Sequence, residues 1–200
     1  MSNRIYHGGL RRRAMVMALM ALAVVATVVL ADVVFVYQGV INVSTTSPPL
    51  TFSTGPNAGP TNTAAAPYIT FTGTNTGFTV SLTVTNSSAV YYYEAGNLTV
   101  NTAGYLYYNS ATTGGTTSMV NTLIIYIQNP TTGANVCTFT VISNGAVQTG
   151  PSTSCPLSAG TTYYVSLKVV PNTPVTSGQT ETITVNFGYN VISSTSVPAP

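Results

Sequence analysis

In most segments after Asp32, hydrophobic residues recur at every second position, which is the repeat of a β-strand. The segment Phe78–Thr85 (FTVSLTVT) illustrates the pattern, because its aromatic and aliphatic residues occupy the even positions and Thr or Ser occupies the odd ones. Such a strand places one face on a hydrophobic core and the other in water. Clusters of Gly, Pro, Asn and Ser separate these segments, and helical spacing is rare. The pattern predicts a body built from strands.

The number and spacing of these segments predict an all-β fold, an antiparallel two-sheet sandwich of the jelly-roll or immunoglobulin-like kind. The chain has no internal repeat, so we expect residues 44–200 to form one sandwich domain. We expect the last strand to bend or split at Gly188. The expected strands are Val33–Val43, Leu50–Ser53, Tyr68–Thr72, Phe78–Thr85, Val90–Tyr93, Asn97–Asn101, Tyr105–Tyr108, Met119–Gln128, Val136–Ser143, Thr162–Val170 and Thr180–Ser193.

Charged residues make up 4% of the chain, against roughly 25% in ordinary soluble proteins. After Ala31 only Asp32, Glu94, Lys168 and Glu181 are charged, and the single His, His7, precedes them. Nucleic acid is excluded as a partner, because binding its phosphates needs clustered Lys or Arg. Without His there is no usual base to activate Ser, and no Cys/His or carboxylate cluster has metal-binding spacing. We therefore expect a structural protein without enzymatic activity, metal or cofactor.

The charged and aromatic residues of the body have simple interpretations. Glu94 stands at an expected turn and Glu181 alternates outward between Thr residues, so we expect both carboxylates in solvent. Lys168 either points to solvent or forms an amide cross-link with an Asn or Asp side chain. The clusters Tyr91–Tyr93 and Tyr163–Tyr164 alternate faces, so each directs some hydroxyl groups outward. Packing on the sheet surface explains these tyrosines, and a platform that stacks on carbohydrate is the alternative.

Residues 1–31 have the layout of a secretory signal, with Arg11–Arg13 followed by the uninterrupted apolar run Ala14–Ala31. We expect cleavage near Ala31, an extracellular or cell-surface location, and contact with the membrane only during export. The run is also about as long as the roughly 18 residues at which a membrane span becomes credible. A retained hydrophobic helix is therefore the alternative.

Two further features fit an exterior location. Cys137 and Cys155 are the only cysteines, and one such pair in an exported chain predicts a disulfide rather than a metal site. Asn42, Asn86 and Asn97 each begin an Asn-X-Ser/Thr sequon, which makes them candidate glycosylation sites, with an unmodified edge or turn Asn as the alternative for each.

The segment 32–43 (DVVFVYQGVINV) carries the sharpest functional hypothesis. One face of an extended strand here is almost entirely apolar, with Val33, Phe35, Tyr37, Gly39, Ile41 and Val43. A strand this hydrophobic must be covered, either within its own sandwich or by another molecule. Insertion into the groove of a second copy, called donor-strand complementation, would join chains head to tail into a filament. Pairing within its own sandwich is the alternative.

The leader, the apolar strand after it (ADVVFVYQGVINV) and the Thr/Asn/Tyr-rich body containing FTVSLTVTNSS together resemble the archaeal bundling pilins, which are related in architecture to the TasA and camelysin biofilm-matrix proteins. The resemblance implies a jelly roll, extracellular fibres joined by amino-terminal donor strands, and lateral association between fibres, with roles in adhesion or biofilm formation. It places the inserted side chains at Val33, Phe35, Tyr37, Ile41 and Val43, with Gly39 allowing close backbone approach.

Two other classes compete with this interpretation. A type IV pilin would retain residues 14–37 as a helix in a filament core, but Arg13 stands where that family usually has Gly or Ala before its cleavage site. A monomeric adhesin or sugar-binding sandwich, anchored by an uncleaved Ala14–Ala31 span, would explain the tyrosines equally well.

Overall fold

The computed structural model describes residues 8–29, 38–115, 119–177, 179 and 181–198. The chain divides into two compact units, Met1–Ser44 and Thr45–Pro200. The first contains helix α1 (Gly8–Val29). Among the described residues, no helix combines the length and the hydrophobicity that a membrane span requires. The second unit contains the strands: β1 (Leu50–Thr54), β2 (Ile69–Gly73), β3 (Phe78–Leu82), β4 (Val90–Val100), β5 (Gly104–Gly115), β6 (Val120–Gln128), β7 (Asn135–Ser143), β8 (Ala146–Val147), β9 (Cys155–Leu157), β10 (Thr161–Pro171) and β11 (Glu181–Asn190).

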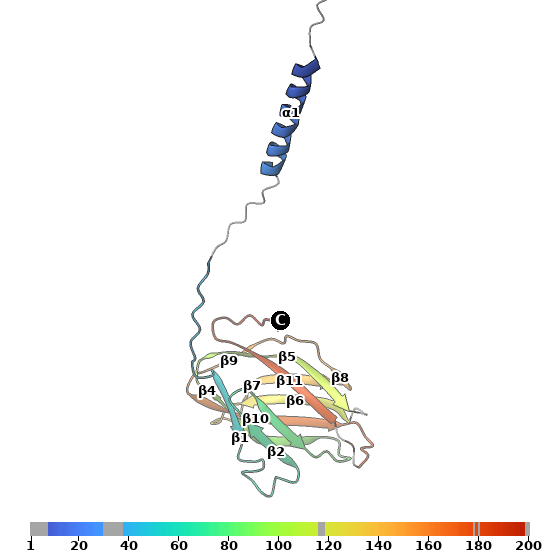
Figure 1. Ribbon diagram of the computed structural model, residues 1–200. Helices are drawn as coiled ribbons and strands as arrows, with labels where there is room; N and C mark the ends of the chain where they lie inside the picture. Colours follow the sequence, from blue (N-terminus) through green and yellow to red (C-terminus); the bar gives the residue numbers. More distant parts are fainter. Residues whose placement is uncertain (1–7, 30–37, 116–118, 178, 180, 199–200) are drawn as a thin grey trace, which may run out of the picture. The chain divides into compact units, whose positions relative to one another are not determined.

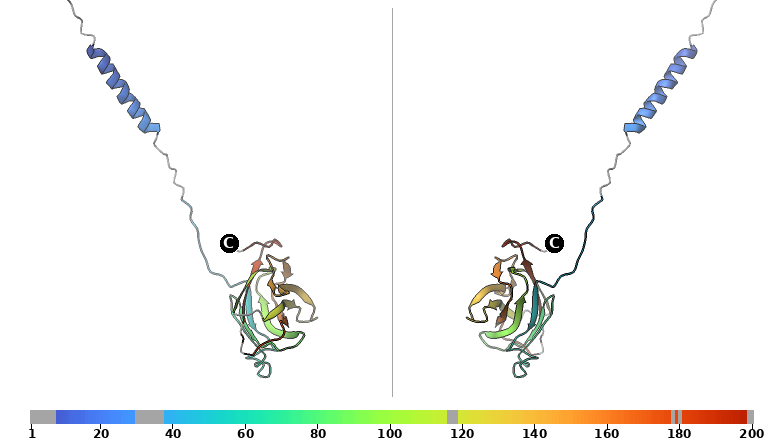
Figure 2. Two further views of the ribbon diagram at one scale, coloured as in Figure 1. Left: turned by 90° about the vertical axis from the view of Figure 1, so that its right-hand side faces the viewer. Right: turned by 90° about the vertical axis from the view of Figure 1, so that its left-hand side faces the viewer.

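The strands form antiparallel sheets, as the alternating sequence predicts (Figure 1). The largest sheet has the order β1-β4-β10-β6-β7-β8. A three-stranded sheet, β11-β5-β9, and the hairpin β2-β3 form the facing layer, and their inward side chains join one hydrophobic core with those of the large sheet (Figure 2). The body is therefore a mostly-β sandwich with its core between two layers.

Strand β10 explains why the core lies where it does. Its inward residues Tyr163, Val165, Leu167 and Val169 are almost fully buried, whereas Thr162 on the opposite face is exposed. Because side chains alternate along a strand, these residues all lie on the same face of the six-stranded sheet, and that face packs on the core.

The two layers are joined along one side by a close approach of β1 and β2. The backbone N–H of Phe52 donates to the carbonyl of Thr74 over 3.0 Å. A Cβ atom at Gly73 would lie 2.2 Å from the Phe52 carbonyl carbon, so only glycine permits this contact.

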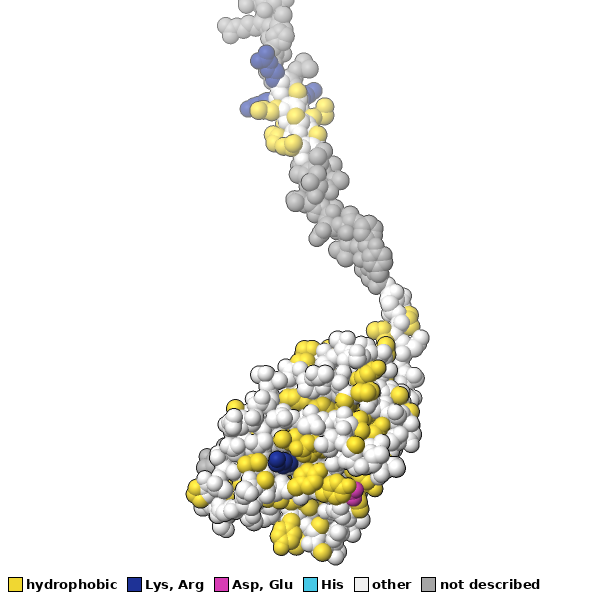
Figure 3. Space-filling model, turned by 180° about the vertical axis from the view of Figure 1, so that it is seen from behind, with side chains coloured by type: hydrophobic (Ala, Val, Ile, Leu, Met, Phe, Trp, Pro, Cys, Tyr) yellow, Lys and Arg dark blue, Asp and Glu magenta, His cyan; other side chains and the backbone are white. Residues whose placement is uncertain are grey.

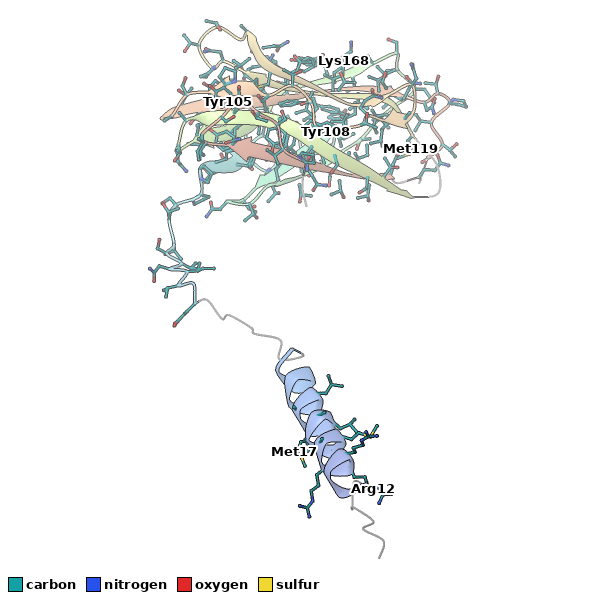
Figure 4. The ribbon with its side chains drawn as sticks, turned by 90° about the horizontal axis from the view of Figure 1, so that it is seen from above. Arg12, Met17, Tyr105, Tyr108, Met119 and Lys168 are labelled. Atoms are coloured by element: carbon teal, nitrogen blue, oxygen red, sulfur yellow. A yellow bond between two sulfur atoms is a disulfide. The ribbon has the colours of Figure 1, made fainter. Side chains whose placement is uncertain are left out.

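The opposite side is closed by the loop between β8 and β9. The Ser152 N–H donates to the Tyr108 carbonyl at 2.8 Å, and the Tyr108 hydroxyl donates to the Gln148 carbonyl at 2.6 Å. In Figure 4, Tyr108 lies within the body, whereas Lys168 lies on its outer side.

Most expected strands are present, but several boundaries differ. Strand β4 runs continuously through the turn expected at Glu94, where the structure has a bulge instead, and β11 continues through Gly188. Gly188 is needed because the Tyr107 ring packs against its backbone. Residues 38–43 were expected to be part of a strand, but they form no regular secondary structure here. The short strands β8 and β9 were not expected, since two or three residues give no periodic signal.

Candidate functional site: an apolar groove between two edge strands

The facing layer is interrupted between β3 and β11, and the interruption forms a groove of about 900 Å³. Strand β3 is the free edge of the β2-β3 hairpin, and β11 is the free edge of the three-stranded sheet. The rim consists of Phe78, Val80 and Leu82 from β3 and Ile183, Val185 and Phe187 from β11, and the floor consists of Leu123 and Ile125 from β6 with Leu167 and Val169 from β10.

Rim and floor differ in burial. The four floor residues are at most 6% exposed, whereas the inward side chains of β3 and β11 are only half-buried. Each half-buried apolar side chain leaves a share of its burial free energy unrealised, at roughly 25 cal/mol per Å². The groove is therefore a continuous apolar surface that a covering segment would stabilise.

Aromatic rings meet across the groove at one point. The ring centroids of Phe78 and Phe187, one from each edge, are 6.2 Å apart. Phe78 also stacks on Phe71 at 4.9 Å, and Phe187 contacts Phe139 at 5.5 Å. These contacts narrow the groove locally.

The two edges run in opposite directions. Phe78, the first residue of β3, meets Phe187 near the end of β11. All of β3 and all of β11 except its last residue line the groove, so β3 must run back toward Glu181, where β11 begins. Both edges present backbone N–H and C=O groups toward the interruption.

Glu181 closes the far end of the groove, which corrects the expectation that its carboxylate is solvated. Its Oε2 accepts hydrogen bonds from the N–H groups of Met119 at 2.6 Å and Val120 at 3.2 Å. The carboxylate thereby ties the start of β11 to the start of β6.

The expected donor residues fall partly within the described chain. Val33, Phe35 and Tyr37 lie outside the described residues. Gly39, Ile41 and Val43 are described and exposed, with Ile41 88% and Val43 90% accessible to solvent.

The predicted disulfide is present, because Cys137 of β7 is bonded to Cys155 of β9. The three sequons have different surroundings. Asn42 and Asn86 are exposed, whereas Asn97 lies within β4 and its Nδ2 donates to the Thr54 carbonyl at 2.9 Å. A glycan on Asn97 would be attached to this same nitrogen.

No family model and no curated protein matches this chain. The site must therefore be interpreted from its own geometry. Within the described part of the chain, no group of three or more His, Cys, Asp or Glu side chains could hold a metal ion.

The remaining charged residues of the body lie on separate strands. The Glu94 Oε2 accepts a hydrogen bond from Asn57 Nδ2 at 3.3 Å. Lys168 lies opposite Tyr91 on one neighbouring strand and Ile124 on the other, so neither cross-strand neighbour offers the carboxamide or carboxylate that an amide cross-link needs. The absence of enzymatic activity stays a prediction.

Two buried tyrosines and one half-buried tyrosine predict a loss of stability in alkali. Burial raises the pKa of Tyr92, Tyr108 and Tyr189 above the ordinary 10.0, and each hydroxyl donates to a backbone carbonyl at 2.6 Å. Because the folded-state pKa is the higher one, this stabilisation is complete below the unfolded pKa and is lost as pH rises through the folded pKa. We expect the urea concentration at the unfolding midpoint to decrease as the pH is raised from about 10 to 12.

Circular dichroism at a series of pH values, with tyrosinate absorbance followed in parallel, measures this loss. Tyr189→Phe should be less stable than wild type at neutral pH but should lose less stability in alkali. A urea midpoint that stays constant across this pH range would contradict the assignment.

Proposed function

We propose that the chain is a structural subunit of an extracellular filament, in which the segment 32–43 of one copy completes the sandwich of the next by donor-strand complementation. The observation that carries the proposal is the groove between β3 and β11, an apolar surface bounded by two free strand edges. The completed fold would be a jelly roll. Its partner is a second copy of the same chain.

Strand addition fits the chemistry of the groove. An inserted strand would pair its backbone with both edges and direct alternate side chains onto the apolar floor. It would cover the half-buried rim and remove two free edges, which are otherwise sites of uncontrolled association. Since β3 and β11 are antiparallel to each other, the inserted strand would be antiparallel to one and parallel to the other, and both pairings form regular ladders.

The segment 32–43 matches this requirement. Its alternating apolar face supplies the inward side chains, and its described residues are exposed in a single chain. Gly39 interrupts the bulky side chains near the middle of that face. A residue without a side chain fits where Phe78 and Phe187 narrow the groove, because the inserted backbone can approach the rings there.

A nearly uncharged surface supports association between copies. Residues 45–200 contain only Glu94, Lys168 and Glu181 as charged side chains, so subunits repel one another weakly and lateral contacts between filaments meet little electrostatic resistance. Adhesion or biofilm formation is the role that such filaments would serve.

Electron microscopy of cell-surface material, combined with intact mass, tests the proposal. We expect filaments whose subunits begin near Asp32, with an extra strand between β3 and β11. Subunits beginning near Ala14 would favour a retained helical core, as in type IV pilins. Isolated particles with residues 33–43 in their own groove would contradict the proposal and favour a monomeric adhesin.

A further inference from the structure

The outer face of the six-stranded sheet gathers tyrosines from strands far apart in the sequence. Tyr91 of β4, Lys168 of β10 and Ile124 of β6 lie in one cross-strand row, and Tyr126 of β6 pairs with Ser166 in the next. We call Tyr91, Tyr93, Tyr126 and Lys168 the tyrosine face. Figure 3 shows one dark-blue side chain on the body with hydrophobic side chains around it, and the sequence has Lys168 as its only Lys or Arg after Arg13.

Tyr91 and Tyr93, two residues apart in β4, lie at the start of a bulge. Between the pairs Tyr92–Leu167 and Gly96–Val165, β4 contains three residues and β10 contains only Ser166. Glu94 takes a φ of 52° within the bulge, and Tyr91 and Tyr93 are both exposed. The Tyr91 ring centroid lies 6.0 Å from those of Tyr93 and Tyr126.

A buried polar network lies beneath these rings. Ser166 is fully buried, its Oγ accepts the Glu94 N–H at 2.9 Å, and its hydroxyl donates to Gln128 Oε1 at 2.5 Å. Gln128 is 5% exposed and its Nε2 donates to the Tyr91 hydroxyl at 3.1 Å. The network holds Tyr91 in place before any partner arrives, which lowers the entropy cost of binding.

Lys168 stands beside these fixed rings without a counter-ion. Among the described residues, no carboxylate lies within ion-pair distance of its ammonium group. The body's two side-chain carboxylates are both engaged, Glu94 by Asn57 and Glu181 by backbone N–H groups. An anionic ligand would supply the counter-ion that Lys168 lacks within its own chain.

We propose that the tyrosine face binds acidic polysaccharide, with a sugar ring stacked on Tyr91 and a uronate carboxylate paired with Lys168. Tyrosine suits this role because it offers a rigid apolar ring together with a polar hydroxyl. The ammonium–carboxylate contact is a charge-assisted hydrogen bond, which selects acidic over neutral sugars. The inference goes beyond the filament proposal, because Lys168 alternates outward from the residues of β10 that form the groove floor.

Titration calorimetry of the purified full chain tests this inference with a linear oligogalacturonate and a neutral gluco-oligosaccharide of equal length. We expect the acidic sugar to bind at least tenfold more tightly, with an affinity that falls as salt rises. Lys168→Gln should remove that preference, and Tyr91→Ala should weaken both sugars about tenfold or more. Tyr68→Ala is the matched control, since Tyr68 is 60% exposed outside the tyrosine face, and it should bind as wild type does.

Three outcomes would overturn the proposal. They are a wild-type chain that binds neither sugar, equal affinity for the acidic and the neutral sugar, and unchanged acidic-sugar affinity in Lys168→Gln. Self-association that Tyr91→Ala abolishes, without sugar binding by the wild type, would likewise overturn it and would assign the face to contacts between copies.

Discussion

Phe35→Asp is expected to abolish assembly while leaving the body folded. Phe35 lies on the apolar face of the segment 32–43, so in an assembled chain its side chain would enter the groove. A carboxylate there would be removed from water without a partner, because the groove floor is formed by aliphatic side chains. We expect a cost of at least about 3 kcal/mol per junction, which weakens each junction more than a hundredfold.

Val34→Asp provides the matched control. Val34 is the neighbouring residue on the opposite face of an extended segment, so the same charge would face water rather than the groove. Sedimentation velocity of both variants and of the wild type measures polymer mass. If Phe35→Asp polymerises as fully as Val34→Asp, the segment does not insert through its apolar face.

Val185→Arg is expected to abolish assembly from the acceptor side. Val185 lines the groove from the edge strand β11 and is half-buried, so a longer side chain there would occupy the space of an inserted strand. The body should stay folded, since an arginine at a half-exposed edge can extend its guanidinium to water. Thr184 borders the groove through its backbone, but its side chain is on the exposed face of the strand, so Thr184→Arg is the control and should still assemble.

Mixing the two variants gives the sharpest outcome. Phe35→Asp retains an intact groove and Val185→Arg retains an intact donor segment, so the mixture should form one-to-one dimers that cannot grow further. Dimers in the mixture, with monomers in each variant alone, would locate donor and acceptor on different surfaces. Monomers in the mixture would contradict the assignment of the groove between β3 and β11 as the acceptor.

The sequence predicts the strands of the body well, because alternation in segments such as 78–85 and 162–170 is strong. It predicts the disulfide too, since Cys137 and Cys155 leave only one pairing. It gives the wrong surroundings for Glu94, where a turn was expected, and for Glu181, whose carboxylate was expected in solvent. Their neighbours along the chain suggest turns and solvent, whereas Ser166 and Met119, which contact them, are distant in sequence.

The groove and the tyrosine face could not be predicted in the same way. The groove exists because β3 and β11, about a hundred residues apart, end up as facing edges, and periodicity contains no information about strand order. Tyr91 and Tyr93 are visible as a cluster in the sequence. The contact between the Tyr91 and Tyr126 rings depends on the pairing of β4, β10 and β6, which the sequence does not reveal. The hydrogen-bond network through Gln128 and Ser166 depends on the same pairing.

The disulfide between β7 and β9 fastens the six-stranded sheet to the three-stranded one by a covalent clasp. Closing a loop of this size stabilises a fold by about 3 kcal/mol. In the filament that we propose, a subunit that has not yet bound its neighbour lacks the strand that completes its sandwich. The disulfide would hold the two sheets of such a subunit together until an inserted strand fills the groove.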